Sequence, residues 1–266
     1  MTASALLADP ILRLEHVSKT FGGVQAVRDV SLAIPQGIIF GIIGPNGAGK
    51  TTLFNCISGF CVPNAGGHIH YQGRNLVGRP VHAIARLGIA RTFQNISLLT
   101  DQTVRQNLLI GLHLSLGYGP LAAVWPGRRV HAAEAQAQAD IERLADLLAV
   151  PRSALDGQVD ALSLGMQKKV EVARAVIRRP RLLLLDEPAG GLNDRETEDL
   201  GRSLVALRRE LDLSIVLIDH DMSLVMSLCD QLCVLNFGEL IAQGPPADMQ
   251  QDPKVVSVYL GTADAA

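Results

Sequence analysis

The sequence predicts an α/β fold with a parallel central sheet, an antiparallel β subdomain before it and an inserted helical subdomain. Three observations support this prediction. Short apolar runs, typical of strands buried on both faces, recur along the chain. Near the N-terminus, apolar and polar residues alternate instead, as in strands with one exposed face. Between about residues 103 and 150 the pattern becomes helical.

The elements of the N-terminal part follow from these patterns. Residues 11–17 (ILRLEHV) and 30–34 (VSLAI) alternate and predict antiparallel, half-exposed strands. Residues 38–43 (IIFGII) predict a buried strand, followed after a glycine-rich loop by a helix that ends near Gly59. Residues 68–73 (HIHYQG) predict one strand of a further hairpin.

The helical insert consists of two amphipathic segments. Val104, Leu108 and Leu112 recur at helical spacing in the first. In the second, the apolar stripe comprises Ile141, Leu144, Ala145 and Leu148. A stretch rich in glycine and proline around Trp125 separates the two segments, and we expect Trp125 to pack against the insert.

The α/β pattern returns in the C-terminal part. Residues 182–188 (LLLLDEP) and 214–220 (SIVLIDH) each begin as a buried strand, and the charged segment 194–211 between them predicts a helix. Residues 233–244 (CVLNFGELIAQG) predict a terminal strand pair.

Composition excludes several classes of protein. The 266 residues carry a formal net charge of −2, which argues against a dedicated nucleic-acid binder. No apolar run approaches the roughly 18 residues of a membrane span, and residues 1–10 do not form a secretory signal. We therefore expect a cytosolic protein that could still dock on a membrane partner. The four cysteines match no zinc pattern, which favours ordinary packing over a metal site with His68 and His70.

Residues 44–52 (GPNGAGKTT) fit the phosphate-loop pattern G-x-x-x-x-G-K-[ST] in its expected context, between a strand and a helix. Glycines let the backbone approach phosphates closely, and successive N–H groups at the helix start bind them. Lys50 would add a cation, and the Thr51 hydroxyl would be a ligand of Mg²⁺. The predicted nucleotide-binding residues are Gly44, Pro45, Asn46, Gly47, Ala48, Gly49, Lys50, Thr51 and Thr52.

Two acidic residues follow the buried strand at 182–185. Asp186 and Glu187 come at the carboxyl end of this strand, the edge at which α/β sheets bind ligands. Asp186 suits a role at a Mg²⁺ site in the second coordination shell, around the direct ligands of the cation. Glu187 suits a general base that polarises an attacking water. With the phosphate loop, this pair predicts a P-loop NTPase.

Four further segments narrow the class. Residues 162–180 (LSLGMQKKVEVARAVIRRP) resemble the signature segment of ABC-type ATPases. Residues 91–94 (RTFQ), 189–194 (AGGLND) and 217–221 (LIDHD) resemble the Q-loop, D-loop and switch-histidine segments of that family, in the same order. The resemblance spans roughly residues 11–261. It implies a RecA-like core with both subdomains, forming one ATPase domain over residues 10–262 with the helical subdomain at about 95–178 and flexible ends at 1–9 and 263–266.

The resemblance also implies how the site residues act on ATP and Mg²⁺. Gln94 would contact Mg²⁺ and the attacking water, and would pass a signal to a membrane partner. His220 would hold the γ-phosphate and the geometry around Glu187. Phe21, in the segment KTFGGVQAV, would stack on adenine.

In this family two ATPase subunits pack head to tail, and each ATP lies between the phosphate loop of one and the signature of the other. Ser163 and Gly165 would therefore serve the γ-phosphate bound by the partner subunit, and Asn193 would lie at the contact. The sequence departs from the usual pattern at Leu164, where glycine is common, and at Met166, where glutamine is common.

The C-terminal segment 217–261 and the segment 88–111 resemble the branch that serves branched-chain amino-acid importers; there Asp194 replaces a frequent proline. The branch implies two transmembrane permeases, a second ATPase chain, related or identical, an indirectly associated substrate-binding protein, and a peripheral position on the cytoplasmic face of the inner membrane. Two alternatives remain: the ATPase of a lipid or lipopolysaccharide exporter, and a soluble ABC ATPase of DNA repair or translation. A P-loop kinase would leave LSLGMQ and LIDHD unexplained.

Overall fold

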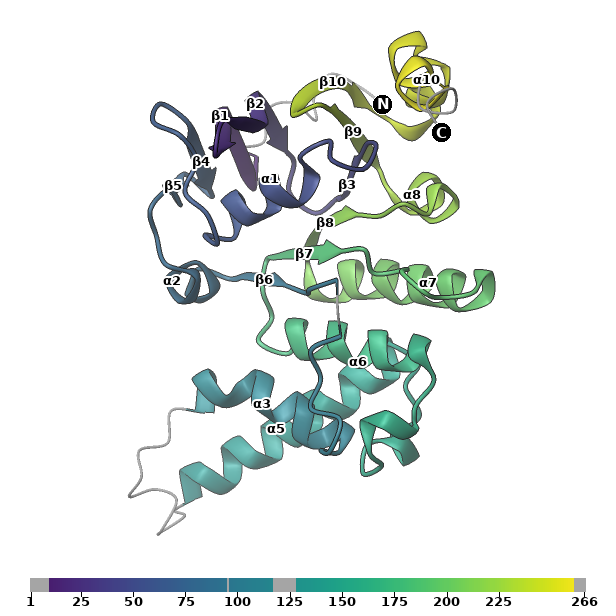
Figure 1. The fold of residues 1–266 in the computed structure, drawn as a ribbon. Helices are drawn as coiled ribbons and strands as arrows, with labels where there is room; N and C mark the ends of the chain where they lie inside the picture. Colours follow the sequence, from purple (N-terminus) through teal and green to yellow (C-terminus); the bar gives the residue numbers. More distant parts are fainter. Residues whose placement is uncertain (1–9, 95, 117–127, 261–266) are drawn as a thin grey trace.

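The computed structural model describes residues 10–94, 96–116 and 128–260, and Figure 1 shows their arrangement. In the described part of the molecule, the two sheets lie at one end of the fold and a group of helices lies at the other. Trp125 and the chain ends at 1–9 and 263–266 lie outside the described residues, so the predictions made for them stay predictions.

The central sheet has six strands in the order β10-β9-β3-β8-β7-β6. β3, β6, β7, β8 and β9 run parallel, and β10 pairs antiparallel with β9. The strands β3, β7 and β8 are buried throughout, as their continuous apolar runs predict. The bounds of these strands are β3 Ile39–Ile43, β6 Ile89–Arg91, β7 Leu182–Asp186, β8 Ser214–Ile218, β9 Gln231–Asn236 and β10 Glu239–Gly244.

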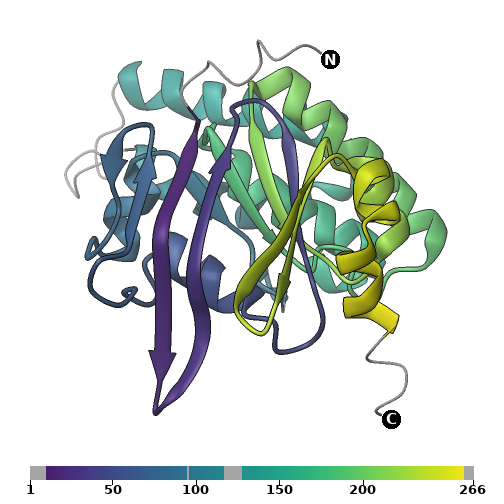
Figure 2. The ribbon, with the colours of Figure 1, turned by 90° about the horizontal axis from the view of Figure 1, so that it is seen from above.

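A second, antiparallel sheet has the order β2-β1-β4-β5, and it contains the half-exposed strands predicted from alternation. Its two long strands form the hairpin seen in Figure 2. The helix α1 (Lys50–Ile57) packs between the two sheets, where Leu53, Phe54 and Ile57 share one apolar core with residues of both. The strands are β1 Leu12–Phe21, β2 Val24–Ile34, β4 His68–Tyr71 and β5 Arg74–Asn75.

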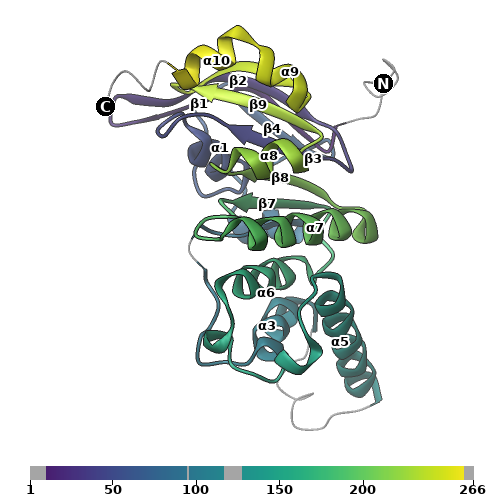
Figure 3. The same ribbon diagram turned by 90° about the vertical axis from the view of Figure 1, so that its right-hand side faces the viewer.

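Helices cover the opposite face of the central sheet. The amphipathic helix α7 (Asp194–Leu211) lies directly on it, and α6, α3 and α5 form the next layer (Figure 3). The apolar residues predicted for the two helical segments of the insert are all buried in a second core, which these helices share with the central sheet. The remaining helices have the bounds α2 Val81–Arg86, α3 Val104–Leu116, α5 Arg128–Leu147, α6 Leu164–Val176, α8 Met222–Leu228, α9 Pro246–Gln251 and α10 Pro253–Leu260, with 3₁₀ turns at Arg152–Ala154 and Val159–Ala161.

This topology brings the chemistry-bearing residues together. The loops after β3, β7 and β8 all leave the carboxyl edge of the same parallel sheet, because neighbouring parallel strands end on the same side. The phosphate loop follows β3. Asp186 is the last residue of β7 and Glu187 comes directly after it, and His220 lies in the loop after β8.

Candidate nucleotide-binding site

The phosphate loop connects β3 to α1 through three glycines with positive φ. Gly44, Gly47 and Gly49 have φ values of 151°, 78° and 97°. A Cβ at Gly44 would clash with the carbonyl oxygen of Leu235, and one at Gly49 with that of Ala26. Only glycine therefore fits these two positions, and the loop is held close to β9 and β2.

Lys50 lies inside this loop. Its Nζ donates hydrogen bonds to the carbonyl oxygens of Gly44 (2.7 Å) and Pro45 (2.9 Å). Burial lowers the pKa of Lys50 below its usual range, and the negative charges of Glu187 and Asp186 oppose this shift. The lysine is thus a buried cation under the electrostatic influence of two carboxylates, a setting in which an anionic phosphate would be a favourable additional partner.

The start of α1 is open. Gly49 is its N-cap and provides no side-chain cap to the first backbone N–H groups. The Thr51 side chain, in the first turn, is exposed, and Thr52 is half-buried. An uncapped helix N-terminus next to a lysine and a free hydroxyl fits a phosphate with a bound cation.

Asp186 ends β7 as one of the few buried carboxylates. Its Oδ2 accepts a hydrogen bond of 2.9 Å from a terminal nitrogen of Arg91, at the end of β6. In the sequence, Arg91 stands out only as the first residue of the RTFQ segment. An arginine at the end of a short strand that pairs with a buried strand can indicate an ion pair. A buried guanidinium requires an acidic or polar partner.

Glu187 is held from both sides. Its Oε2 accepts a hydrogen bond from Gln94 Nε2 (2.7 Å), and its Oε1 lies 2.9 Å from His220 Nε2. Because a carboxylate only accepts, the imidazole N–H is the donor in this pair. Glu187 also has a left-handed backbone, with φ at 50°, which is uncommon for this residue type. Three residues predicted from separate motifs therefore meet.

Two further residues support the loops and were missed by the sequence analysis. The buried Lys168 in α6 extends its Nζ to the carbonyl oxygens of Gln94 and Glu187, each at 3.4 Å. The buried Asp219 accepts hydrogen bonds from the backbone N–H groups of Ala189 (2.9 Å) and Asp221 (3.0 Å). Burial raises the pKa of Asp219, and these backbone donors oppose the shift.

Ser163 and Gly165 lie at the start of α6. Ser163 is the N-cap, and its hydroxyl accepts a hydrogen bond from the N–H of Met166. Gly165 is buried against the side chain of Glu196 in α7, so a larger residue would press on that side chain. Within the described residues, no hydrogen bond or ion pair connects this helix start to the phosphate loop of the same chain.

Comparison with known proteins decides the family. The family model described as ABC transporter matches residues 27–190, more than half of the chain. The model described as Branched-chain amino acid ATP-binding cassette transporter matches residues 239–265. The chain belongs to the ABC transporter ATP-binding proteins, in their branched-chain amino-acid transport group.

Relatives of this ABC ATPase match along almost their whole length. The high-affinity branched-chain amino acid transport ATP-binding protein BraF of Pseudomonas aeruginosa is 39% identical over 97% of this chain and 100% of its own. The corresponding protein LivG of Escherichia coli is also 39% identical, with the same coverage. These names do not favour a lipid exporter or a soluble repair or translation ATPase.

Solved structures of ATP-binding cassettes share the fold of this ABC ATPase. The ADP conformation of MJ1267, an ATP-binding cassette of an ABC transporter, superposes with a TM-score of 0.81 at 30% identity, covering 94% of this chain and 98% of the other. The predicted fold class and the ATPase activity are thereby confirmed. In the described part of the chain, no helix is long and apolar enough to cross a membrane.

Phe21 and Asn193 complete the predicted positions. Phe21 ends β1 and is 50% exposed as a residue, and Lys19 Nζ lies 5.0 Å from its ring centroid. An exposed aromatic ring can stack on a base, whereas a core phenylalanine cannot. Asn193 is the N-cap of α7 and forms a capping box with Glu196.

Proposed function

We propose that this ABC ATPase powers the uptake of branched-chain amino acids or a related small amide, as a subunit that binds and hydrolyses ATP with Mg²⁺. The meeting of Gln94, Glu187 and His220 beside the phosphate-loop Lys50 carries the ATPase part of the proposal. The likeness to BraF and LivG over nearly whole chains supports the solute class.

In the proposed site, the phosphate-loop residues 44–52 hold the triphosphate through backbone N–H groups, and Lys50 neutralises its charge. Phe21 stacks on the adenine. The oxygens of Thr51, Asp186 and Gln94 form the donor set for Mg²⁺, a cation that prefers oxygen ligands. When bound, this cation would neutralise the charge that develops on the phosphates.

We assign the water-activating role to Glu187. A carboxylate with one oxygen towards Gln94 and the other towards His220 is fixed in orientation, which favours proton transfer from a correctly placed water. His220 has a second role in this proposal, since its imidazole can donate to a γ-phosphate oxygen once it leaves Glu187.

The signature residues act on a second subunit in this proposal. Ser163 and Gly165 offer a hydroxyl and a helix N-terminus to an anion. Because no hydrogen bond or ion pair among the described residues joins either of them to the chain's own phosphate loop, we infer that they serve the ATP of a partner ATPase, with Asn193 at the contact. The partner is either a related chain or an identical copy.

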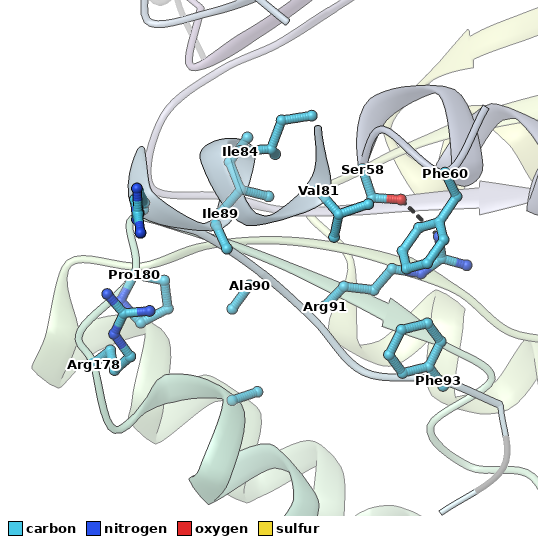
Figure 4. Close-up of a pocket in the computed structure, with 14 residues that line it drawn as sticks. Ser58, Phe60, Val81, Ile84, Ile89, Ala90, Arg91, Phe93, Arg178 and Pro180 are labelled. Atoms are coloured by element: carbon cyan, nitrogen blue, oxygen red, sulfur yellow. Dashed lines mark hydrogen bonds between the residues drawn. The ribbon is translucent and has the colours of Figure 1, made fainter. Parts of the chain in front are cut away.

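We further propose that the two ATPase subunits dock on two transmembrane permeases at the cytoplasmic face of the cell membrane, and that a substrate-binding protein delivers the solute. An apolar hollow of about 320 Å³ beside the Gln94 segment supports a docking role. Phe60, Val81 and Phe93 are exposed around it (Figure 4). Exposed apolar patches of this kind are typical of interaction sites.

The test is to isolate the tagged chain with ATP from its own membranes in mild detergent and to identify the accompanying proteins by mass spectrometry. We expect two permeases and an ATPase partner, and binding of a radiolabelled branched-chain amino acid by the associated binding protein. A Lys50→Ala chain serves as the control, since it should bind ATP weakly. Recovery of lipid-exporter proteins would contradict the solute class, and recovery of soluble partners alone would contradict the transporter assignment.

A further inference from the structure

Arg91 is a buried cation with an unusual set of partners. Its side chain is only 8% exposed, and that of its ion-pair partner Asp186 only 6%. One terminal nitrogen donates to Asp186 Oδ2. The other donates to Asn55 Oδ1 (2.8 Å) and Ser58 Oγ (2.7 Å). The guanidinium therefore joins the end of β7 to the end of α1, the helix that starts at the phosphate loop.

Three aromatic rings enclose the same guanidinium. Its central carbon lies 5.7 Å from the ring centroid of Phe54 and 5.4 Å from those of Phe60 and Phe93. The rings of Phe60 and Phe93 contact each other edge to face at 5.6 Å. Figure 4 shows these two rings around Arg91 at the edge of the apolar hollow. Cations are attracted to ring faces, most strongly where water is excluded.

This enclosure fixes the orientation of Arg91. Its Nε is buried and, among the described residues, has no hydrogen-bond partner, so the polar contacts of the guanidinium lie at its two terminal nitrogens. A planar, forked cation held by rings has little freedom to rotate. Its hydrogen bond to Asp186 therefore has a defined direction.

The consequence falls on the Asp186 carboxylate. Within the described part of the chain, the bond from Arg91 is the single hydrogen bond to this side chain, and it engages Oδ2. Among the described residues Oδ1 accepts no hydrogen bond, and the charge of Asp186 acts on Lys50 of the phosphate loop. A carboxylate that an outer partner holds at one oxygen presents its other oxygen to a metal in a defined orientation.

We propose that Arg91 is a positioning residue for the Mg²⁺ site: it holds Asp186 so that one carboxylate oxygen faces the cation, and it ties this carboxylate to the phosphate-loop helix. The inference rests on the proposed binding of ATP with Mg²⁺. Arg91 acts through Asp186 and contacts neither the nucleotide nor the cation. Buried ion pairs are often replaceable by apolar residues without loss of stability, so stability alone does not explain this pair.

The test measures cation affinity directly. The purified full-length chain is mixed with the non-hydrolysable analogue AMP-PNP, and Mn²⁺ binding is followed by electron paramagnetic resonance. The loss of an outer partner typically costs about 10–100-fold in metal affinity, and we expect this weakening in Arg91→Met. Affinity for AMP-PNP in EDTA should stay within about twofold, because the phosphate loop is unchanged. Arg91→Lys should recover part of the Mn²⁺ affinity, since an ammonium retains the charge but not the fork.

Two further variants separate positioning from folding. Arg105→Met removes another arginine–aspartate pair, with Asp156, away from the site, and should leave Mn²⁺ affinity unchanged. Asn55→Ala keeps the Arg91–Asp186 pair but loosens the guanidinium, and should weaken Mn²⁺ binding less than Arg91→Met. If Arg91→Met does not fold, Arg91→Lys and Asn55→Ala decide.

The outcomes are distinct. Normal Mn²⁺ affinity in all Arg91 and Asn55 variants, with normal binding by the wild type, would overturn this inference alone. A wild-type chain that binds no AMP-PNP would overturn the proposed function and this inference with it. Equal weakening in Arg105→Met would reduce the role of Arg91 to general stability and would also contradict the proposal.

Discussion

At the scale of single residues, Glu187 combines backbone strain with a side chain that has one hydrogen-bond partner at each oxygen. A left-handed backbone costs a non-glycine residue roughly 1–2 kcal/mol, so surrounding contacts must hold it. Its N–H donates to the carbonyl oxygen of Ile218 (2.8 Å), and its own carbonyl accepts from the N–H of Gly190 (3.1 Å). The strained turn directs the side chain to Gln94 and His220, a pattern typical of functional sites.

The first prediction concerns this residue. Glu187→Gln should lower ATP hydrolysis by the assembled transporter roughly 10²–10⁴-fold, because an amide cannot accept the proton of the attacking water. ATP affinity should be retained, since the phosphate loop is untouched and the amide has the same shape. Phosphate release and equilibrium dialysis measure the two quantities. Unchanged turnover would remove Glu187 from the role of general base.

A second prediction concerns Cys229, whose thiol is buried at the end of α8. Burial raises the pKa of Cys229 to about 12 from an ordinary 9.0. A raised folded-state pKa gives stability that is present below pH 9 and is lost as the pH rises from 9 to about 12, because the unfolded chain ionises first. At pH 10 the loss should be about 1.4 kcal/mol relative to pH 8.

Urea unfolding at pH 8 and pH 10 measures this loss, and Cys229→Ala should reduce the difference between the two pH values by that amount. Val225→Ala is the matched control, since Val225 is buried in α8, the helix that Cys229 follows, and does not titrate. It should lower the free energy of unfolding equally at both pH values. An identical pH dependence in Cys229→Ala and the wild type would contradict the prediction.

At the scale of elements, α7 shows how a short sequence fixes a helix start. Asn193 Oδ1 accepts a hydrogen bond from the N–H of Glu196 (3.0 Å), and Glu196 Oε2 accepts one from the N–H of Asn193 (3.3 Å). Asp194 adds a favourable charge in the first turn, and arginines follow in the last turn. The start of α7 is therefore well defined by its cap, although position 194 carries aspartate and not proline.

The third prediction follows from this capping box. Asn193→Ala should lower the free energy of unfolding of the isolated chain by about 1 kcal/mol, because it removes the cap of α7. Asn193→Ser should be close to neutral, since serine caps about as well. Chemical denaturation of both variants gives the comparison. A neutral Asn193→Ala would show that α7 is held by packing alone.

The elements of the fold could be predicted because their patterns are local. The leucine run before Asp186 and the glycines before Lys50 each indicate a strand or loop within a few residues. The contacts that organise the site are not local. Arg91 and Asp186 are 95 positions apart, and Lys168 reaches Gln94 across 74. Such pairs depend on the order of strands in the sheet and on helix packing, which periodicity does not give.

At the scale of the whole molecule, the signature helix and the phosphate loop are separate surfaces. The start of α6 packs on α7, as shown by Gly165 against Glu196, whereas the phosphate loop lies against β2 and β9. One chain thus offers two half-sites, and the proposed function needs a second ATPase chain to complete each.

The fourth prediction tests this division. Ser163→Arg should leave ATP binding by the isolated chain unchanged, because within the described residues no hydrogen bond joins Ser163 to the chain's own phosphate loop. It should abolish turnover in the assembled transporter, where a bulky cation would enter the partner's site. Fluorescence titration with a labelled nucleotide and phosphate release measure the two effects. Weakened binding by the isolated chain would place Ser163 in its own nucleotide site or indicate misfolding.

The hydrogen bonds that hold Glu187 have a consequence for ATP consumption by subunits that are not yet assembled. In a lone chain Gln94 and His220 each lie within hydrogen-bond distance of one oxygen of Glu187, so His220 is still engaged there and does not donate to a γ-phosphate oxygen. We therefore expect newly made chains that have not yet met their partners to leave the ATP pool intact. ATP would be hydrolysed only in assembled transporters, and the resting position of one side chain would keep the unassembled subunit inactive.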